Sequence, residues 1–150
     1  MQKRTITKEE IQRVLQEKIA RYVNLQQTVR AYQLVYEVQR NQLEELIITK
    51  EALKNIKKRD IKKLEGFTSL GSGVFIHVNG TVGEKILVNV GANIGVYMSV
   101  DDAIEILEQR EEKLKGSLEN TARTLNELIN LMAKLEQEIS TLQQYISSIK

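Results

Sequence analysis

Few side chains in this sequence have the types and spacing that catalysis or metal binding requires. Cysteine is absent and His77 is the single histidine, so the chain lacks a thiolate metal site and a cysteine nucleophile. Ser72, Ser99 and His77 have no third partner with a defined role, so they do not suggest a catalytic triad. We interpret His77 as an ordinary strand residue, and we expect no enzyme, no metal and no cofactor.

Two glycine-containing segments, 71–73 and 91–95, resemble phosphate-binding loops only superficially. Neither has the lysine of a P-loop or the GxGxxG spacing that opens a helix, so we interpret both as tight turns. Asp101 and Asp102 form a carboxylate pair, and their place at a predicted helix start explains them.

The basic run from Lys54 to Lys63 is the strongest signal for a polyanionic partner, because clustered lysines can bind phosphate backbones. No aromatic residues are interleaved with it, as single-strand stacking would require. The net charge of +2 is small. We therefore interpret this run as a solvated helix face and expect no nucleic-acid partner.

No targeting or membrane signal stands out in the sequence. The opening residues MQKRTITKEE contain no apolar segment typical of a signal peptide, and no apolar run approaches the roughly 20 residues of a membrane span. We expect a cytoplasmic protein without membrane contact.

The elements around these residues are dominated by helical periodicity. The chain contains no proline, a residue that would interrupt a helix. Thr7 and Glu10 have capping-box spacing, and a heptad pattern follows, which predicts a helix from about residue 8 to about 64. Lys18 and Gln39 interrupt its apolar seam, which otherwise consists of Ile11, Leu15, Tyr22, Leu25, Val29, Tyr32, Tyr36, Leu43, Leu46 and Leu53.

The last third, residues 100–150, has the more regular heptads. Ser99 followed by Asp102 marks the start of this helix. A seam sustained over this many heptads is typical of a coiled coil. Glu111 and Thr121 interrupt it, and its apolar members are Ile104, Leu107, Leu114, Leu118, Leu125, Leu128, Met132, Leu135, Ile139, Leu142, Ile146 and Ile149.

We expect the two helices to fold back on each other as a long antiparallel coiled-coil hairpin, because this buries both seams within one chain. The charges favour the same direction. They would place the basic end of the first helix beside the acidic start of the second, where Glu105, Glu108, Glu111 and Glu112 lie. Exposed ion pairs of this kind set orientation and contribute little stability.

Residues 67–98 interrupt the helices with a β insert. Alternating apolar residues predict one hairpin from Phe67–Leu70 with Val74–Val78 and another from Ile86–Val90 with Ile94–Met98. Residues 79–83 are expected to connect them, although Asn79-Gly80 could instead be the turn of the first hairpin. The apolar residues expected to mediate oligomerisation are Val74, Ile76, Val78, Ile86, Val88, Val90, Ile94, Val96 and Met98.

Such an insert is expected to assemble with other chains. An isolated hairpin is marginally stable in water, and its unpaired edges invite further strand pairing. We therefore predict that hairpins from several subunits close into an oligomeric β-barrel. The whole chain, residues 1–150, is then one mostly α-helical domain with a central β insert.

The order helix, two hairpins, helix, with LGSGVFIHV followed by EKILVNVGANIGVYMSVDDAIEIL, resembles the α-type subunits of the prefoldin family. This resemblance implies a hexamer of two α-type and four β-type subunits with a β-barrel platform. It also implies that the tips of the helical arms bind non-native polypeptides and deliver them to a group II chaperonin without ATP hydrolysis. The apolar tip residues are Ile6, Ile11, Leu15, Ile19, Leu142, Tyr145, Ile146 and Ile149.

Two interpretations of the tip residues remain open, namely packing between the helices and exposure to a client. Most tip residues occupy seam positions, where packing between the helices explains them, whereas Ile6, Ile19 and Tyr145 lie off the seam.

The function of the chain also has two interpretations. The alternative to a chaperone is a structural coiled-coil tether that oligomerises through its insert.

Overall fold

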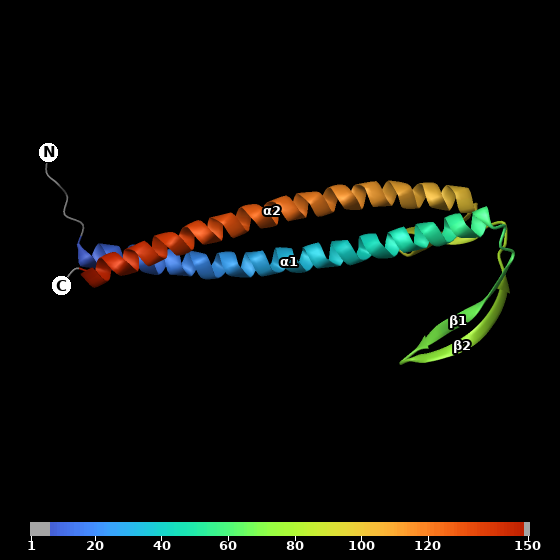
Figure 1. Cartoon of the computed structure of the whole chain (residues 1–150), viewed down its shortest axis with the longest axis horizontal. Coiled ribbons are helices and arrows are strands. Elements are labelled where there is room, and N and C mark those ends of the chain that lie inside the picture. Colours follow the sequence, from blue (N-terminus) through green and yellow to red (C-terminus); the bar gives the residue numbers. More distant parts are fainter. Residues whose placement is uncertain (1–6, 149–150) are drawn as a thin grey trace. The chain divides into compact units, whose positions relative to one another are not determined.

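The computed structural model describes residues 7–148. It confirms the predicted fold class, two long helices with two antiparallel β-hairpins between them (Figure 1). The elements are α1 (Lys8–Lys58), β1 (Lys63–Gly71), β2 (Val74–Thr81), β3 (Ile86–Gly91), β4 (Ile94–Met98) and α2 (Val100–Ser148). The chain divides into a terminal unit, Met1–Arg40 with Gly116–Lys150, and a central unit, Asn41–Lys115.

Both predicted helix starts are confirmed by their capping bonds. The Glu10 amide donates to Thr7 Oγ1 at 3.3 Å, and the Thr7 amide donates to Glu10 Oε2 at 3.0 Å. At α2 the Asp102 amide donates to Ser99 Oγ at 3.0 Å. These bonds satisfy amides that the first helical turn leaves without partners.

The first helix ends at Lys58, not near residue 64 as predicted. Asp60 adopts a left-handed φ of 48°. The Ile61 amide donates to the Ile56 carbonyl at 3.0 Å, and the Asp60 amide donates to that of Lys57 at 3.2 Å. This is the Schellman motif, in which glycine most often occupies the left-handed position. Here the position is held by Asp60, so no glycine in the sequence signals the helix end.

In the terminal unit, α1 and α2 pack antiparallel along the predicted seams. Ile11, Leu25, Val29 and Leu135 are buried. Lys18, which interrupts the seam, forms an ion pair with Glu138 at 2.6 Å. Gln39, the other interruption, donates from Nε2 to Ser117 Oγ at 2.9 Å. Both polar interruptions of the α1 seam are therefore bonded to α2.

In the central unit, opposite charges meet as predicted. Lys54 pairs with Glu108 at 2.8 Å, and Lys57 pairs with Asp101. The later residue of α1, Lys57, pairs with the earlier residue of α2, Asp101, so the helices are antiparallel here too (Figure 1). Ala103 and Leu107 are buried beneath these pairs.

The hairpins form two separate two-stranded sheets, each ending in a two-residue turn. The turn residues, Ser72-Gly73 and Ala92-Asn93, all have positive φ, as a type I′ turn requires. The strand before each turn is irregular at its end, between Ser69 and Gly71 and between Asn89 and Gly91. The two hairpins therefore repeat one local design.

The first hairpin is longer than predicted. β1 begins at Lys63 rather than Phe67, and β2 continues to Thr81. Asn79 pairs with Glu65, and Gly80 pairs with Leu64. The segment expected to connect the hairpins, or to form a turn, therefore lies largely within a strand.

Candidate functional site

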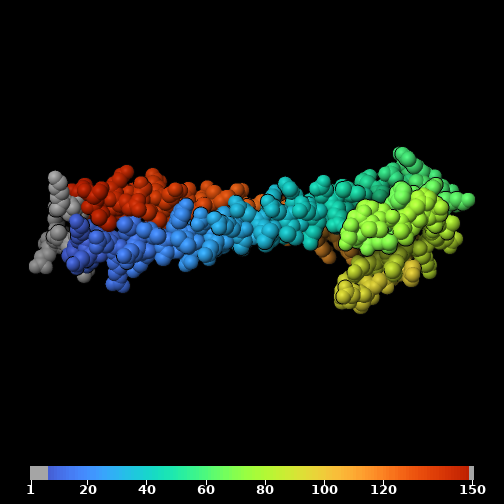
Figure 2. Space-filling view, turned by 90° about the horizontal axis from the view of Figure 1, so that it is seen from below, coloured from blue at the N-terminus to red at the C-terminus, as the bar shows by residue number. Residues whose placement is uncertain are grey.

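The apolar faces of the hairpins are exposed at most of the predicted oligomerisation positions. Six of the nine predicted oligomerisation residues are exposed, namely Val74, Ile76, Val78, Val90, Ile94 and Val96. Ile86, Val88 and Met98 are half-buried. Figure 2 shows both hairpins, in light green and yellow, uncovered by the rest of the chain on the face in view.

The opposite faces of the strands also carry exposed apolar residues. Leu87 pairs with Tyr97, and their side chains are 60% and 68% exposed. Phe67 is 73% exposed, and its ring meets the His77 ring edge-on at a centroid distance of 5.3 Å. Each two-stranded sheet thus exposes apolar residues on both faces, and no other strand among the described residues pairs with its edges. A surface of this kind suits assembly with further strands.

One side-chain bond joins the insert to a helix within the central unit, and further bonds hold the first hairpin together. Arg110 on α2 donates from Nη2 to the Asn89 carbonyl at 2.6 Å. The Val82 amide donates to the Lys62 carbonyl at 2.9 Å, which closes the base of the first hairpin. His77 Nε2 lies 3.0 Å from a Glu65 carboxylate oxygen across the strands. His77 is thus a strand residue, as interpreted from the sequence.

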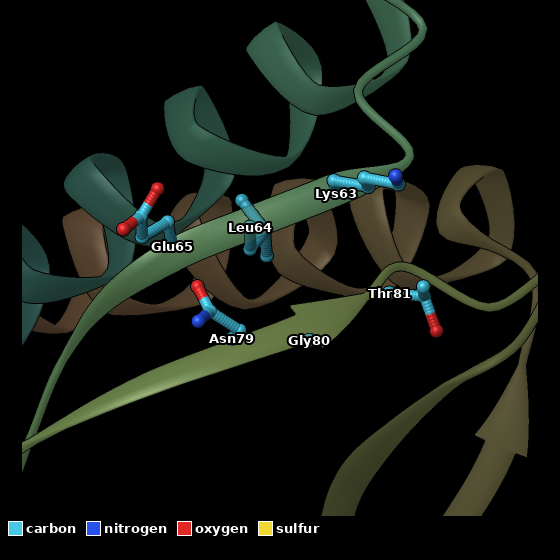
Figure 3. A pocket seen from close by; sticks show the side chains of 6 residues that line it. All are labelled: Lys63, Leu64, Glu65, Asn79, Gly80 and Thr81. Atoms are coloured by element: carbon cyan, nitrogen blue, oxygen red, sulfur yellow. The ribbon is translucent and has the colours of Figure 1, made fainter.

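A shallow hollow at the base of the first hairpin offers no catalytic arrangement. Figure 3 shows the residues of both strands that line it, Lys63, Leu64, Glu65, Asn79, Gly80 and Thr81. Lys63 and Glu65 are the charged members, and they occupy alternate positions of one strand. We see an open stretch of sheet surface here rather than an enclosed binding site.

The predicted tip residues fall into three groups. Ile19 and Tyr145 are exposed, at 39% and 54%. Leu15, Leu142 and Ile146 are half-buried in the helix pair, and Ile11 is buried at 7%. Ile6 and Ile149 lie outside the described residues. Ile19 also lines a groove beside the seam, together with Tyr22 and Ile139.

Glu111 is the most strongly perturbed acid among the described residues. Its carboxylate is 12% exposed and accepts hydrogen bonds from Lys115 at 2.6 Å and from Lys50 at 2.5 Å. These two ammonium groups lower the pKa of Glu111 from 4.5 to about 2. Lys54 lowers the pKa of Glu108, and Lys18 lowers that of Glu138. The pairs Lys50–Glu111, Lys54–Glu108 and Lys18–Glu138 each join α1 to α2, so we interpret them as structural.

A group of exposed apolar residues on α1 lies outside the predicted seam. Leu34, Val35 and Val38 are 63%, 47% and 47% exposed. With Ala31, which is also exposed, they follow the i, i+3, i+4, i+7 spacing of one helix face. That spacing is visible in the sequence, but the heptad pattern assigns only the seam positions and does not single out this face.

Within residues 7–148, no group of three or more histidine, cysteine, aspartate or glutamate side chains is placed to hold a metal ion. No helix in the same range is long and apolar enough to cross a membrane.

Comparisons with known proteins converge on one family. The model of the prefoldin subunit family matches residues 25–145. The chain is 29% identical to the prefoldin subunit alpha of Archaeoglobus fulgidus over 133 residues, covering 87% of this chain and 94% of that protein. It is 29% identical to the prefoldin subunit alpha of Pyrococcus horikoshii over 102 residues, covering 67% and 68% of the two chains.

Among solved structures, a chain of filamentous prefoldin from Methanocaldococcus jannaschii matches with a TM-score of 0.45 and 25% identity, over 77% of this chain and 98% of the other.

Proposed function

Because this chain belongs to the prefoldin family as an α-type subunit, we propose that it captures non-native polypeptides, prevents their aggregation and delivers them to a group II chaperonin. The family match carries this proposal, because residues 25–145 span both hairpins and most of both helices. Delivery uses no ATP hydrolysis. The working site is apolar surface rather than a catalytic centre.

The exposed hairpin faces support assembly as the first step. We propose that they pair with β-type subunits in a hexamer of two α-type and four β-type chains, located in the cytoplasm. Burial of apolar area is the dominant favourable term in such association. The helices already bury their own seams, so the hairpins carry the subunit contacts.

We propose that clients bind where the helices end. Ile19 and Tyr145 are exposed there, and the half-buried Leu15, Leu142 and Ile146 become available when the last turns open. Ile6, Ile11 and Ile149 complete the proposed set. Each contact is weak, and several arms bound to one client gain strength through multivalency.

The test uses the assembled complex and a chemically denatured client diluted from guanidinium, with aggregation followed by light scattering. Removing about two turns, roughly seven residues per helix end, from a chain that also carries Ile19→Gln is expected to leave the oligomer intact and abolish suppression of aggregation. The point variant Ile19→Gln with Tyr145→Gln is expected to weaken suppression. Its control is Arg13→Gln, which removes only an exposed ion pair with Glu17.

Full protection by the trimmed complex would exclude the helix ends as the client site. A complex that assembles but never slows aggregation, even untrimmed, would instead identify a structural tether.

A further inference from the structure

We propose that α1 carries a second client-binding surface, separate from the helix ends, on the face formed by Ala31, Leu34, Val35 and Val38. We refer to these four residues as the Leu34 ridge. The inference deepens the proposed chaperone function and rests on it. Its occupant is an apolar segment of a non-native polypeptide.

The ridge lies on a face of α1 that α2 does not cover. The seam residues nearby, Val29 and Tyr36, are buried and half-buried, whereas Leu34 is 63% exposed. Side chains three and four residues apart on a helix are neighbours, so the four residues form continuous apolar surface over two turns. The pairing of the two helices therefore does not account for it.

Ile48 shows what an incidental exposed apolar residue looks like on the same helix. It is also 63% exposed. Its helical neighbours at three and four residues are Glu44, Glu45, Glu51 and Ala52, so carboxylates surround it. Leu34 instead has Ala31 and Val38 beside it, with Arg30 and Glu37 as flanking charges of opposite sign. Because the two flanking charges cancel, the surroundings of the ridge carry no net charge that would disfavour an apolar ligand.

The size of the ridge decides between occupants. A stable interface between folded proteins buries about 800 Å² on each partner, far more than four side chains on two helical turns provide. A second copy of the chain or a folded partner would therefore bind too weakly here. An unfolded chain needs only small apolar patches, each contributing in proportion to the area it buries, and several arms can bind it together.

The test measures binding of fluorescently labelled, reduced and carboxymethylated α-lactalbumin, a permanently non-native chain, to the assembled complex by anisotropy. The variant carries Leu34→Gln, Val35→Gln and Val38→Gln, and the matched control is Ile48→Gln. Glutamine is a good helix former, so the helix should persist. The ridge variant is expected to raise Kd by about threefold or more through lost apolar burial, and the control is expected to leave Kd unchanged.

A photo-crosslinker placed at position 34 or 48 of the otherwise native chain provides a second measurement, which is independent of the variant's folding. Crosslinking to the labelled client at 34 and not at 48 supports the ridge. Unchanged Kd in the ridge variant, together with absence of a crosslink at 34, overturns the inference and leaves the helix-end function standing. If the native complex does not bind the client, the proposed function fails and the ridge fails with it.

Discussion

The paired helices bury most of their predicted apolar seam, whereas the hairpins leave most of their apolar residues exposed. Along the helices most seam residues are buried or half-buried, as Val29 and Leu135 illustrate, and Tyr32 is the exposed exception in α1. In the hairpins, residues such as Phe75 and Tyr97 are 60% and 68% exposed. The helical pair therefore buries its seam within one chain, whereas the insert leaves exposed apolar surface that we propose other chains cover. This contrast separates what stabilises the subunit from what assembles it.

The strongest test of this contrast is a substitution in the insert that prevents assembly and leaves the helices folded. Ile76→Asp places a charge on an apolar strand face and is expected to abolish oligomerisation, since burying an unpaired carboxylate is strongly unfavourable. Size-exclusion chromatography with light scattering measures the oligomer, and circular dichroism measures the helix content, which should be unchanged.

Ser72→Asp is the matched control, because it adds the same charge at the hairpin turn. Ser72 has a left-handed φ of 49°, a conformation that aspartate tolerates. The control is expected to assemble normally. Normal assembly of Ile76→Asp would show that this strand face is not part of the subunit interface.

The complementary change weakens the helices. Leu135 is 5% exposed in the seam of the terminal unit, so Leu135→Ala is expected to lower the free energy of unfolding by about 2–3 kcal/mol through lost burial and the cavity left behind. Urea unfolding followed by circular dichroism measures this loss.

Leu131 lies one turn away on the same helix and is 41% exposed. Leu131→Ala is therefore expected to change the free energy of unfolding by less than about 0.5 kcal/mol. Equal losses for the two substitutions would mean that the seam is not where the helical pair obtains its stability.

The smallest expected effect concerns pH. The pKa of Glu111 is lowered from 4.5 to about 2 in the folded chain. Its charge therefore stabilises the fold fully above about pH 4.5, and this contribution is lost as the pH falls from 4.5 towards 2. Glu108 and Glu138, whose pKa values are also lowered, act in the same direction.

Thermal unfolding at pH 7, 4 and 3 is expected to show falling Tm for the native chain. Glu111→Gln cannot titrate and is expected to show a shallower fall between pH 4 and pH 3, although its Tm at pH 7 is lower because Lys50 loses a partner. Parallel pH profiles for the two proteins would exclude Glu111 as a source of acid sensitivity.

Prediction of the fold succeeded where local chemistry was decisive. Ser99 and Asp102 marked the start of α2, and the heptads placed Leu107 and Leu135 in the seam. It failed at the end of α1, because Asp60 adopts a left-handed conformation that is usually left to glycine. It also failed at Asn79-Gly80, which was expected in the connection or in a turn and instead lies in β2, paired with β1.

The expected binding residues at the helix ends stay predictions, and their environments were not uniform. Ile11 proved buried while Ile19 and Tyr145 are exposed. A seam position says which residues face the neighbouring helix, but the neighbour's register and the nearness of the end decide how much surface remains open.

By itself, the sequence determined the periodicities of this protein: two long heptad helices, capped by Thr7 and Ser99, around a glycine-punctuated β insert. These follow from local backbone preference and from side-chain spacing, which act within a few residues. Only the tertiary structure decided which apolar residues are buried by packing and which are exposed, as Leu34 and the hairpin residues are. Exposure depends on what lies across from a residue, and that neighbour comes from a distant part of the chain.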